Sequence, residues 1–310
     1  MNKPSQSLNL YQPGLLPLDQ APETQKVMSY KRTIARWLDR PGGRWVLKKT
    51  ATLYARRFYR ADVEIAHLNG LWTHRVEADF FPDGPTFEFV GLGRWKTQKE
   101  EYLRDSTEFW LKHYRPNKGD VIIDVGAGRG EDTFTFSQVV GDIGRVIAIE
   151  ASPRSFSILK SFCELNRLRN VTAVHAALMD RPGVVRIAED ELSWIQDSIH
   201  CGDNAQGMEV PGLRLDDICQ QSELKDIAFI KMNIEGAERY ALLGMEAAIR
   251  FTRQICVACH DFRSENGHGE QYRTRAFVEQ FLSKNGFSVT SNPDDPRDYV
   301  RDHVFGLRCD

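Results

Sequence analysis

The sequence predicts an α/β protein built on a mostly parallel sheet, and three observations support that prediction. Short apolar strands alternate with helical stretches from about residue 97 to residue 307. The predicted strand 121–125 passes directly into a glycine-rich turn and a helix start. A second strand, 145–149, ends at the carboxylate Glu150. Strands that alternate with helices form parallel sheets with right-handed crossovers, and ligands bind beyond the carboxyl ends of such strands.

Length and composition are those of a globular protein. The chain has 310 residues, of which 41% are hydrophobic and 27% charged, and a formal net charge of −2. A charge this close to zero gives no general attraction to nucleic acid, and we expect no nucleic-acid partner. No apolar run is long enough to span a bilayer. Six cysteines without a framework pattern indicate reduced thiols, so we expect a cytoplasmic protein.

The composition divides the chain into three parts. Residues 1–25 are polar and contain prolines, which is typical of a flexible tail. Residues 26–96 form a basic helical and irregular extension, in which the break at 41–43 separates two helices. Residues 97–310 form the domain that carries the glycine loop. The basic helices either cap this domain with an aromatic side, leaving the basic side in solvent, or contact an anionic membrane surface or an acidic partner.

Within 97–310 each element is predicted from its own pattern. Residues 97–114 show the three- and four-residue spacing of a helix. Ser152 and Pro153 are typical of a helix N-cap and first position, and this helix should end near residue 165. The polar stretch 188–208 is predicted to be one wall of the substrate pocket. The remaining predicted elements are strands 171–175, 184–187, 226–232 and 254–259, helices from 215, from about 238 to 249 and from 272 to 284, and a final antiparallel pair, 287–290 and 303–307.

The glycine turn and Glu150 together predict a nucleoside site. Gly126 and Gly128 let a ligand approach the backbone, and the helix start behind them directs N–H groups at it. Glu150 can accept hydrogen bonds from both hydroxyls of a ribose. A dinucleotide fingerprint needs a third glycine where this chain has Glu131, and an acid is unfavourable beside a pyrophosphate. S-adenosylmethionine (SAM) has no phosphate, so the turn favours SAM over NAD.

The turn at 176–178 follows the third strand, where small and apolar residues suit an adenine ring. We therefore predict a cofactor site shared among four strand ends. Its residues are Asp124, Gly126, Ala127, Gly128, Glu150, Ala151, Ala177 and Asn233.

The glycine loop, Glu150, residues 215–218 and 230–238, and the terminal helix–strand–strand unit together resemble the FkbM-type SAM-dependent methyltransferases. The resemblance covers about residues 97–307. The resemblance implies a Rossmann-like methyltransferase fold, with a mostly parallel seven-stranded sheet and an antiparallel last strand. It also implies methyl transfer from SAM, usually to a hydroxyl oxygen of a sugar, polyketide or similar metabolite. The family commonly has Asp where this chain has Asn233, which can be neither a base nor a good metal ligand. We predict no metal site.

A hydroxyl acceptor benefits from a base that removes its proton. His260 is the first candidate because an unperturbed imidazole can be neutral near pH 7. Glu235 is the second, and Lys231, which would need a lowered pKa, is the third. His260 could equally be a capping residue, and Glu235 could equally balance a helix dipole. The leading function is O-methylation of a hydroxylated small molecule, sugar or glycan. The alternatives are an N-methyltransferase acting on an amine and a nicotinamide-dependent oxidoreductase.

Overall fold

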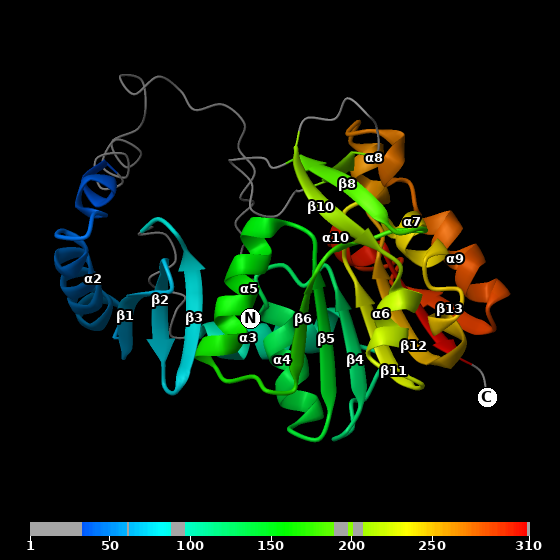
Figure 1. The fold of residues 1–310 in the computed structure, drawn as a ribbon, viewed down its shortest axis with the longest axis horizontal. Coiled ribbons are helices and arrows are strands. Elements are labelled where there is room, and N and C mark those ends of the chain that lie inside the picture. The colour runs from blue at the N-terminus through cyan, green and yellow to red at the C-terminus, as the bar shows by residue number, and fades with distance from the viewer. Residues whose placement is uncertain (1–32, 61, 88–96, 189–197, 201–206, 309–310) are drawn as a thin grey trace, which may run out of the picture.

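The computed structural model describes residues 33–60, 62–87, 97–188, 198–200 and 207–308. Figure 1 shows a small N-terminal unit, formed by α2 and three strands, beside a larger α/β domain. None of the described helices combines the length and the apolar character that crossing a membrane requires.

The larger domain is built on a sheet of seven strands in the order β13-β14-β12-β11-β4-β5-β6. Only β14 runs antiparallel to the other six strands. The chain order reverses between β4 and β11, which places the ligand crevice at their carboxyl ends. This topology confirms the predicted Rossmann-like fold with its antiparallel last strand. The strands are β4 (Val121–Val125), β5 (Arg145–Glu150), β6 (Val171–His175), β11 (Ile227–Met232), β12 (Thr252–Ala258), β13 (Phe287–Ser291) and β14 (His303–Arg308).

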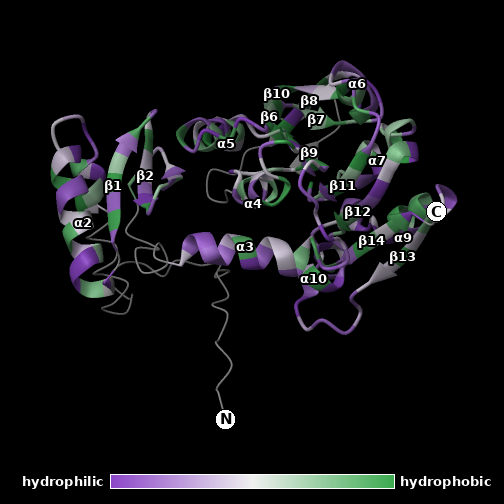
Figure 2. Ribbon diagram, turned by 90° about the horizontal axis from the view of Figure 1, so that it is seen from below, coloured by the Kyte–Doolittle hydropathy of each residue, from purple (hydrophilic) through white to green (hydrophobic). Residues whose placement is uncertain are grey.

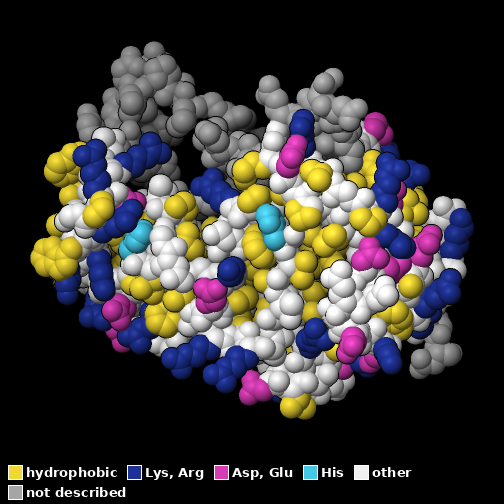
Figure 3. Space-filling view, viewed as in Figure 1, with side chains coloured by type: hydrophobic (Ala, Val, Ile, Leu, Met, Phe, Trp, Pro, Cys, Tyr) yellow, Lys and Arg dark blue, Asp and Glu magenta, His cyan; other side chains and the backbone are white. Residues whose placement is uncertain are grey.

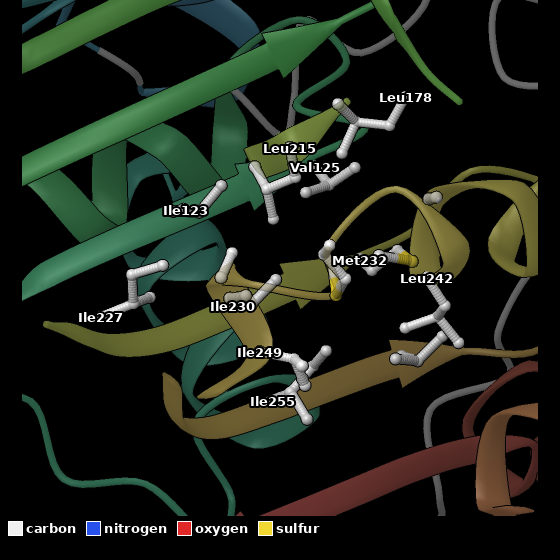
Figure 4. Packing of buried hydrophobic residues seen from close by; sticks show 14 of the residues in the cluster. Ile123, Val125, Leu178, Leu215, Ile227, Ile230, Met232, Leu242, Ile249 and Ile255 are labelled. Carbon is white, nitrogen blue, oxygen red and sulfur yellow. The ribbon is translucent and has the colours of Figure 1, made fainter. Parts of the chain in front are cut away.

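Both faces of this sheet are covered, which explains its continuous apolar strands. Ile122 packs with Phe136 on one face, whereas its neighbour Ile123 packs with Leu215 and Leu242 on the other. Figure 4 shows the cluster that contains Ile123, Leu215 and Leu242, around β4, β11 and β12. The helices of the domain are α3 (Gln98–Phe109), α4 (Glu131–Val140), α5 (Pro153–Leu165), α6 (Leu215–Gln221), α7 (Glu238–Leu243), α8 (Asp261–Glu265), α9 (Arg275–Lys284) and α10 (Asp298–Arg301).

Three helices differ from their predicted bounds. The helix predicted over 97–114 ends at Phe109, and in the other two distant carboxylates bind the backbone. The helix expected to reach residue 249 ends at Leu243, and a 3₁₀ helix, Ala248–Phe251, follows. Asp216 accepts hydrogen bonds from the N–H groups of Ala247 and Ala248, at 3.1 and 2.8 Å, so these groups do not continue α7. Helix α9 begins only at Arg275, where Asp261 accepts the N–H groups of residues 274 and 275. A short 3₁₀ helix, Glu270–Tyr272, precedes it.

A second sheet is formed by four strands that follow β6 in the chain, in the order β7-β10-β8-β9. Its strands are β7 (Ala177–Leu178), β8 (Gly183–Ala188), β9 (Ser198–His200) and β10 (Met208–Leu213). Strand β8 confirms the predicted strand 184–187. Of the stretch predicted to wall the substrate pocket, 189–197 and 201–206 lie outside the described residues. Strand β10 was not predicted because Pro211 and Gly212 are unfavourable within a strand.

The N-terminal unit consists of the helical residues 33–38, α2 (Arg44–Tyr59) and an antiparallel sheet. The two helices and the break between them were predicted, but the sheet was not. Its strands are β1 (Val63–Leu68), β2 (Leu71–Val76) and β3 (Asp79–Gly84). Asn69 and Gly70, both with positive φ, join β1 to β2, and Asn-Gly is the strongest short hairpin signal.

Packing of α2 differs from the expected cap. Its buried side is formed by Leu47, Ala51 and Ala55, which pack on β1 and β2. The aromatic side does not pack on the main domain, because Trp45 remains 66% exposed. Figure 2 shows hydrophilic and hydrophobic residues interleaved along α2. The unit contacts the domain through β3, where Asn166, the residue that follows α5, bonds both the N–H and the carbonyl of Phe80.

Candidate active site

A cavity of about 330 Å³ lies at the carboxyl ends of β4, β5, β6 and β11. This is the edge at which the strand order reverses, as the fold predicts. The cavity is lined by residues 125–129, 131, 132, 149–152, 155, 176–178, 187, 231 and 233–235.

The glycine loop between β4 and α4 forms the floor of this cavity. Gly126 has a φ of +71°, and a Cβ there would lie 1.9 Å from the carbonyl oxygen of Asn233. No side chain fits at that position. Gly128 has a φ of +57°, and a Cβ there would meet no atom closer than 4.0 Å. The backbone at Gly128 therefore faces open space, which a ligand can approach closely.

Glu150 is held rigidly at the edge of the loop. One carboxylate oxygen accepts the N–H of Gly128 at 2.7 Å, and the other accepts the N–H of Ser152 at 2.8 Å. These two bonds fix the orientation of the carboxylate, which lines the cavity. The side chain thus has the position and chemistry expected of a ribose acceptor.

Asp124 does not line the cavity but supports the loop from below. Its side chain is 0% exposed, and one oxygen lies 2.9 Å from Lys231 Nζ. The Thr133 hydroxyl donates to the other oxygen at 2.6 Å. Lys231 also donates to the Gly126 carbonyl at 2.7 Å, so the ion pair fixes the loop's first residue. Asp124 therefore lies outside the cavity lining, and its contacts with Lys231 and Thr133 brace the loop.

Lys231 does not have the lowered pKa that a base at this position would need. Burial acts to lower its pKa, but the carboxylates of Asp124 and Asp132 outweigh burial, and the pKa of Lys231 is raised. Lys231 is consequently a permanent cation at the cavity wall.

His260 lies behind Glu235 and is not a cavity residue. Its Nδ1 is 3.0 Å from Glu238 Oε1, and its Nε2 is 3.3 Å from Glu235 Oε2. Burial acts to lower its pKa, but bonds to these two carboxylates raise the pKa of His260 to about 10. The ring is therefore protonated at neutral pH. The expectation of a neutral His260 base does not agree with these surroundings.

Glu235 does line the cavity, and two cations hold it. Its Oε2 lies 3.0 Å from Arg263 Nη2 in addition to its contact with His260. Burial acts to raise its pKa, but His260 and Arg263 outweigh burial, and the pKa of Glu235 is lowered. Glu235 has a φ of +55°, an uncommon conformation for a residue with a side chain. Strain of this kind clusters at functional sites.

Asp132 is a cavity carboxylate that the sequence analysis missed. It lies in the first turn of α4, 3.5 Å from Lys231 Nζ, and accepts the Ser106 hydroxyl at 2.7 Å. Burial raises the pKa of Asp132 to about 6, although Lys231 opposes the rise. The available signal was its position just after the glycine loop, where a side chain on the inner side of the first helical turn faces the bound ligand.

The charges around the cavity favour a cationic ligand. Four acids and two bases line it, namely Glu131, Asp132, Glu150, Glu235, Arg129 and Lys231. A pyrophosphate would meet this excess of acids unfavourably, whereas a sulfonium and an ammonium group would be stabilised.

Residues 124–289 match the family described as methyltransferase FkbM domain. The chain belongs to the FkbM methyltransferase family. The match confirms the resemblance predicted from the sequence, and SAM is the methyl donor of this family.

Solved structures similar to this FkbM chain include an FkbM methyltransferase from Methylobacillus flagellatus KT, with 17% identity and a TM-score of 0.45. That similarity covers 71% of this chain, which spans only 55% of the length of the M. flagellatus protein. An O-methyltransferase from Bacillus cereus in complex with SAH shows 15% identity, covers 68% of this chain and 80% of that one, and has a TM-score of 0.40. Aeropyrum pernix fibrillarin with bound SAM shows 14% identity, coverage of 79% and 98%, and a TM-score of 0.40. No curated protein matches the chain.

The cavity of this FkbM protein fits SAM. Asn233 Oδ1 is buried and has no hydrogen-bond donor among the described residues, so an ammonium group would satisfy it. Apolar side chains, among them Ala151, Ala177 and Leu178, also line the cavity and suit an adenine ring. The predicted cofactor residues that line the cavity are Gly126, Ala127, Gly128, Glu150, Ala151, Ala177 and Asn233.

Proposed function

We propose that this protein is a SAM-dependent methyltransferase that methylates a hydroxyl oxygen of a small-molecule, sugar or glycan acceptor. The observation that carries the proposal is Glu150, bonded by the amides of Gly128 and Ser152 at the edge of an acidic cavity. When bound, SAM supplies an activated methyl group on a positively charged sulfur. The chain's own residues then have to hold the donor, orient the acceptor and receive its proton.

The donor is held by the strand tips of β4 and β5. The loop at Gly126 and Gly128 would let the methionine part of SAM approach the backbone closely, and Glu150 would accept the ribose hydroxyls. Ala151 and Ala177 would pack on the adenine ring, and Asn233 would hold the ammonium group through Oδ1.

Two carboxylates are available for the acceptor, and we assign them different roles. Asp132 accepts the proton of the hydroxyl, because a pKa of about 6 lies closer to neutral pH than that of an ordinary carboxylate. Glu235 orients the hydroxyl, since His260 and Arg263 fix its carboxylate from behind. His260 is then a positioning residue.

The free thiols of the described cysteines support a reducing compartment, and we propose the cytoplasm. These are Cys163, Cys219, Cys256 and Cys259.

The experiment that tests the function uses SAM labelled in its methyl group. The full chain is incubated with hydroxylated acceptors (monosaccharides, oligosaccharides and polyketides) and with matched amines, and the labelled bond is identified by mass spectrometry and NMR. We expect an O-methyl product whose formation requires Asp132. A labelled N-methyl product with no O-methyl product would assign the protein to amine methylation and contradict the proposal.

A further inference from the structure

Helix α2 has two apolar sides, and the fold uses only one. Leu47, Ala51 and Ala55 are buried on the small sheet. On the opposite side Trp45 is 66% and Leu53 69% exposed. Exposed large apolar side chains lose the favourable free energy of burial, so their presence in a row calls for a partner.

The exposed side of α2 also carries basic residues. We call the set Trp45, Lys49, Leu53, Arg56 and Arg57 the α2 face. Trp45, Lys49, Leu53 and Arg57 follow one another at four-residue intervals, which places them in one row along the helix. Figure 3 shows hydrophobic side chains standing among Lys and Arg at the edge of the molecule formed by α2.

The charge of this region is strongly positive. Residues 33–60 contain eight Arg and Lys and one acid, Asp39, whereas the whole chain has a net charge of −2. Asp39 cannot neutralise the α2 face, because it is bound inward by Arg44 and by the indole N–H of Trp72. Among the described residues, Arg56 pairs with Asp62 at 3.2 Å, but no acid pairs with Lys49. The α2 face therefore combines net positive charge with exposed indole and alkyl groups.

We propose that the α2 face docks this protein on the surface of an anionic lipid bilayer. Arg and Lys are attracted to acidic headgroups, while Trp and Leu enter the boundary between headgroups and acyl chains. The helix would lie in the plane of the membrane, with Leu47 and Ala51 still packed on the sheet. A bilayer supplies both acidic headgroups for the cations and an apolar layer for Trp45 and Leu53, whereas nucleic acid supplies phosphates but little apolar surface for Leu53.

Vesicle co-sedimentation of the full chain tests this proposal. We expect binding to vesicles of phosphatidylcholine mixed with phosphatidylserine, weak binding to phosphatidylcholine alone, and release at high salt. The double variant Trp45→Ala/Leu53→Ala should bind at least about tenfold more weakly, since it removes the inserted apolar groups. The matched control is Ile143→Ala/Val184→Ala, which removes side chains that are 80% and 69% exposed elsewhere on the molecule. We expect this control to bind as the unchanged chain does.

Two charge-reversal variants test the role of the basic residues. Lys49→Glu/Arg57→Glu should abolish the preference for phosphatidylserine, whereas Lys225→Glu, at another exposed site, should preserve it. Unchanged thermal unfolding of each variant shows that the fold is intact. Equal vesicle binding by the Trp45/Leu53 variant and its control would overturn the proposal. Binding to RNA or polyglutamate without binding to vesicles would also overturn it, and would assign the α2 face to an acidic macromolecule.

Discussion

Two charged clusters flank the cavity and have the same arrangement. In each, a cation lies between a fully buried carboxylate and a carboxylate at the cavity wall. In the first, Lys231 lies between Asp124 and Asp132, which are 0% and 23% exposed. In the second, His260 lies between Glu238 and Glu235, which are 0% and 14% exposed. The second cluster has one more cation, Arg263.

That additional cation sets the two cavity carboxylates apart. Asp124 and Asp132 share one lysine, so the first cluster keeps a net negative charge and the pKa of Asp132 rises to about 6 with burial. Glu235 has both His260 and Arg263, so the second cluster is neutral and the pKa of Glu235 falls despite burial. Two carboxylates in similar clusters can therefore have different roles: Asp132 that of a proton acceptor and Glu235 that of a fixed hydrogen-bond acceptor.

The largest effect is expected when the shared lysine of the first cluster is removed. Lys231→Met leaves Asp124 as an unpaired buried charge, which should lower the free energy of unfolding by about 3–5 kcal/mol. Urea denaturation measures the change. The double variant Lys231→Met/Asp124→Asn should recover part of the loss, because the uncompensated charge is gone. If the double variant were no more stable than the single one, the ion pair would not be the brace of the glycine loop.

Asp132→Asn tests the assignment of the base and should reduce turnover about a hundredfold to ten-thousandfold. Stability should change little, because Lys231 keeps its shorter contact with Asp124. In the unchanged enzyme the base must be deprotonated, so turnover should fall as the pH drops below about 6. A pH–rate profile of both proteins measures this. Asp142→Asn, at an exposed site just after α4, is the control, and an equal loss of turnover there would contradict the assignment of Asp132 as the base.

His260→Gln tests the second cluster and should have the smallest effect on turnover. We expect a higher KM for the acceptor with kcat changed less, because Glu235 loses one of two positioning partners. The raised pKa of His260 has a consequence for stability. The contribution of protonated His260 to the free energy of unfolding is fully present below about pH 6.5, the pKa of the residue in the unfolded chain. It is lost as the pH rises toward about 10, the pKa in the folded protein. Thermal melting across this range should show a decline that the variant lacks; parallel curves would contradict a protonated His260.

Sequence alone predicted the strands of the seven-stranded sheet, and seven of the eight predicted cofactor residues line the cavity, for a physical reason. Strands such as β4 and β11 are buried on both faces, so each is a continuous apolar run bounded by turn residues. The loop at Gly126 depends on local backbone geometry, which glycine spacing encodes. The Asn69-Gly70 hairpin carried a signal of the same kind, but the strands beside it lack clear alternation and the sheet was missed.

The properties that failed to appear in the sequence are those set by distant contacts. Whether His260 is neutral depends on Glu235 and Glu238, which reach it from another strand end. The raised pKa of Asp132 depends on its burial against β11. The exposure of Trp45 depends on which side of α2 meets the small sheet. Each requires the assembled fold rather than a local pattern.

We propose that the cavity lined by Gly128 and Glu150 binds SAM, and isothermal titration calorimetry tests this directly. We predict that SAM binds the unchanged protein at one site, that NAD does not bind, and that Glu150→Ala weakens SAM binding at least about tenfold, since it removes the charged acceptor of the ribose hydroxyls. Glu209→Ala, at an exposed site on β10, should bind SAM as the unchanged protein does. Binding of NAD in place of SAM, or SAM binding that is unaffected by Glu150→Ala, would contradict the account.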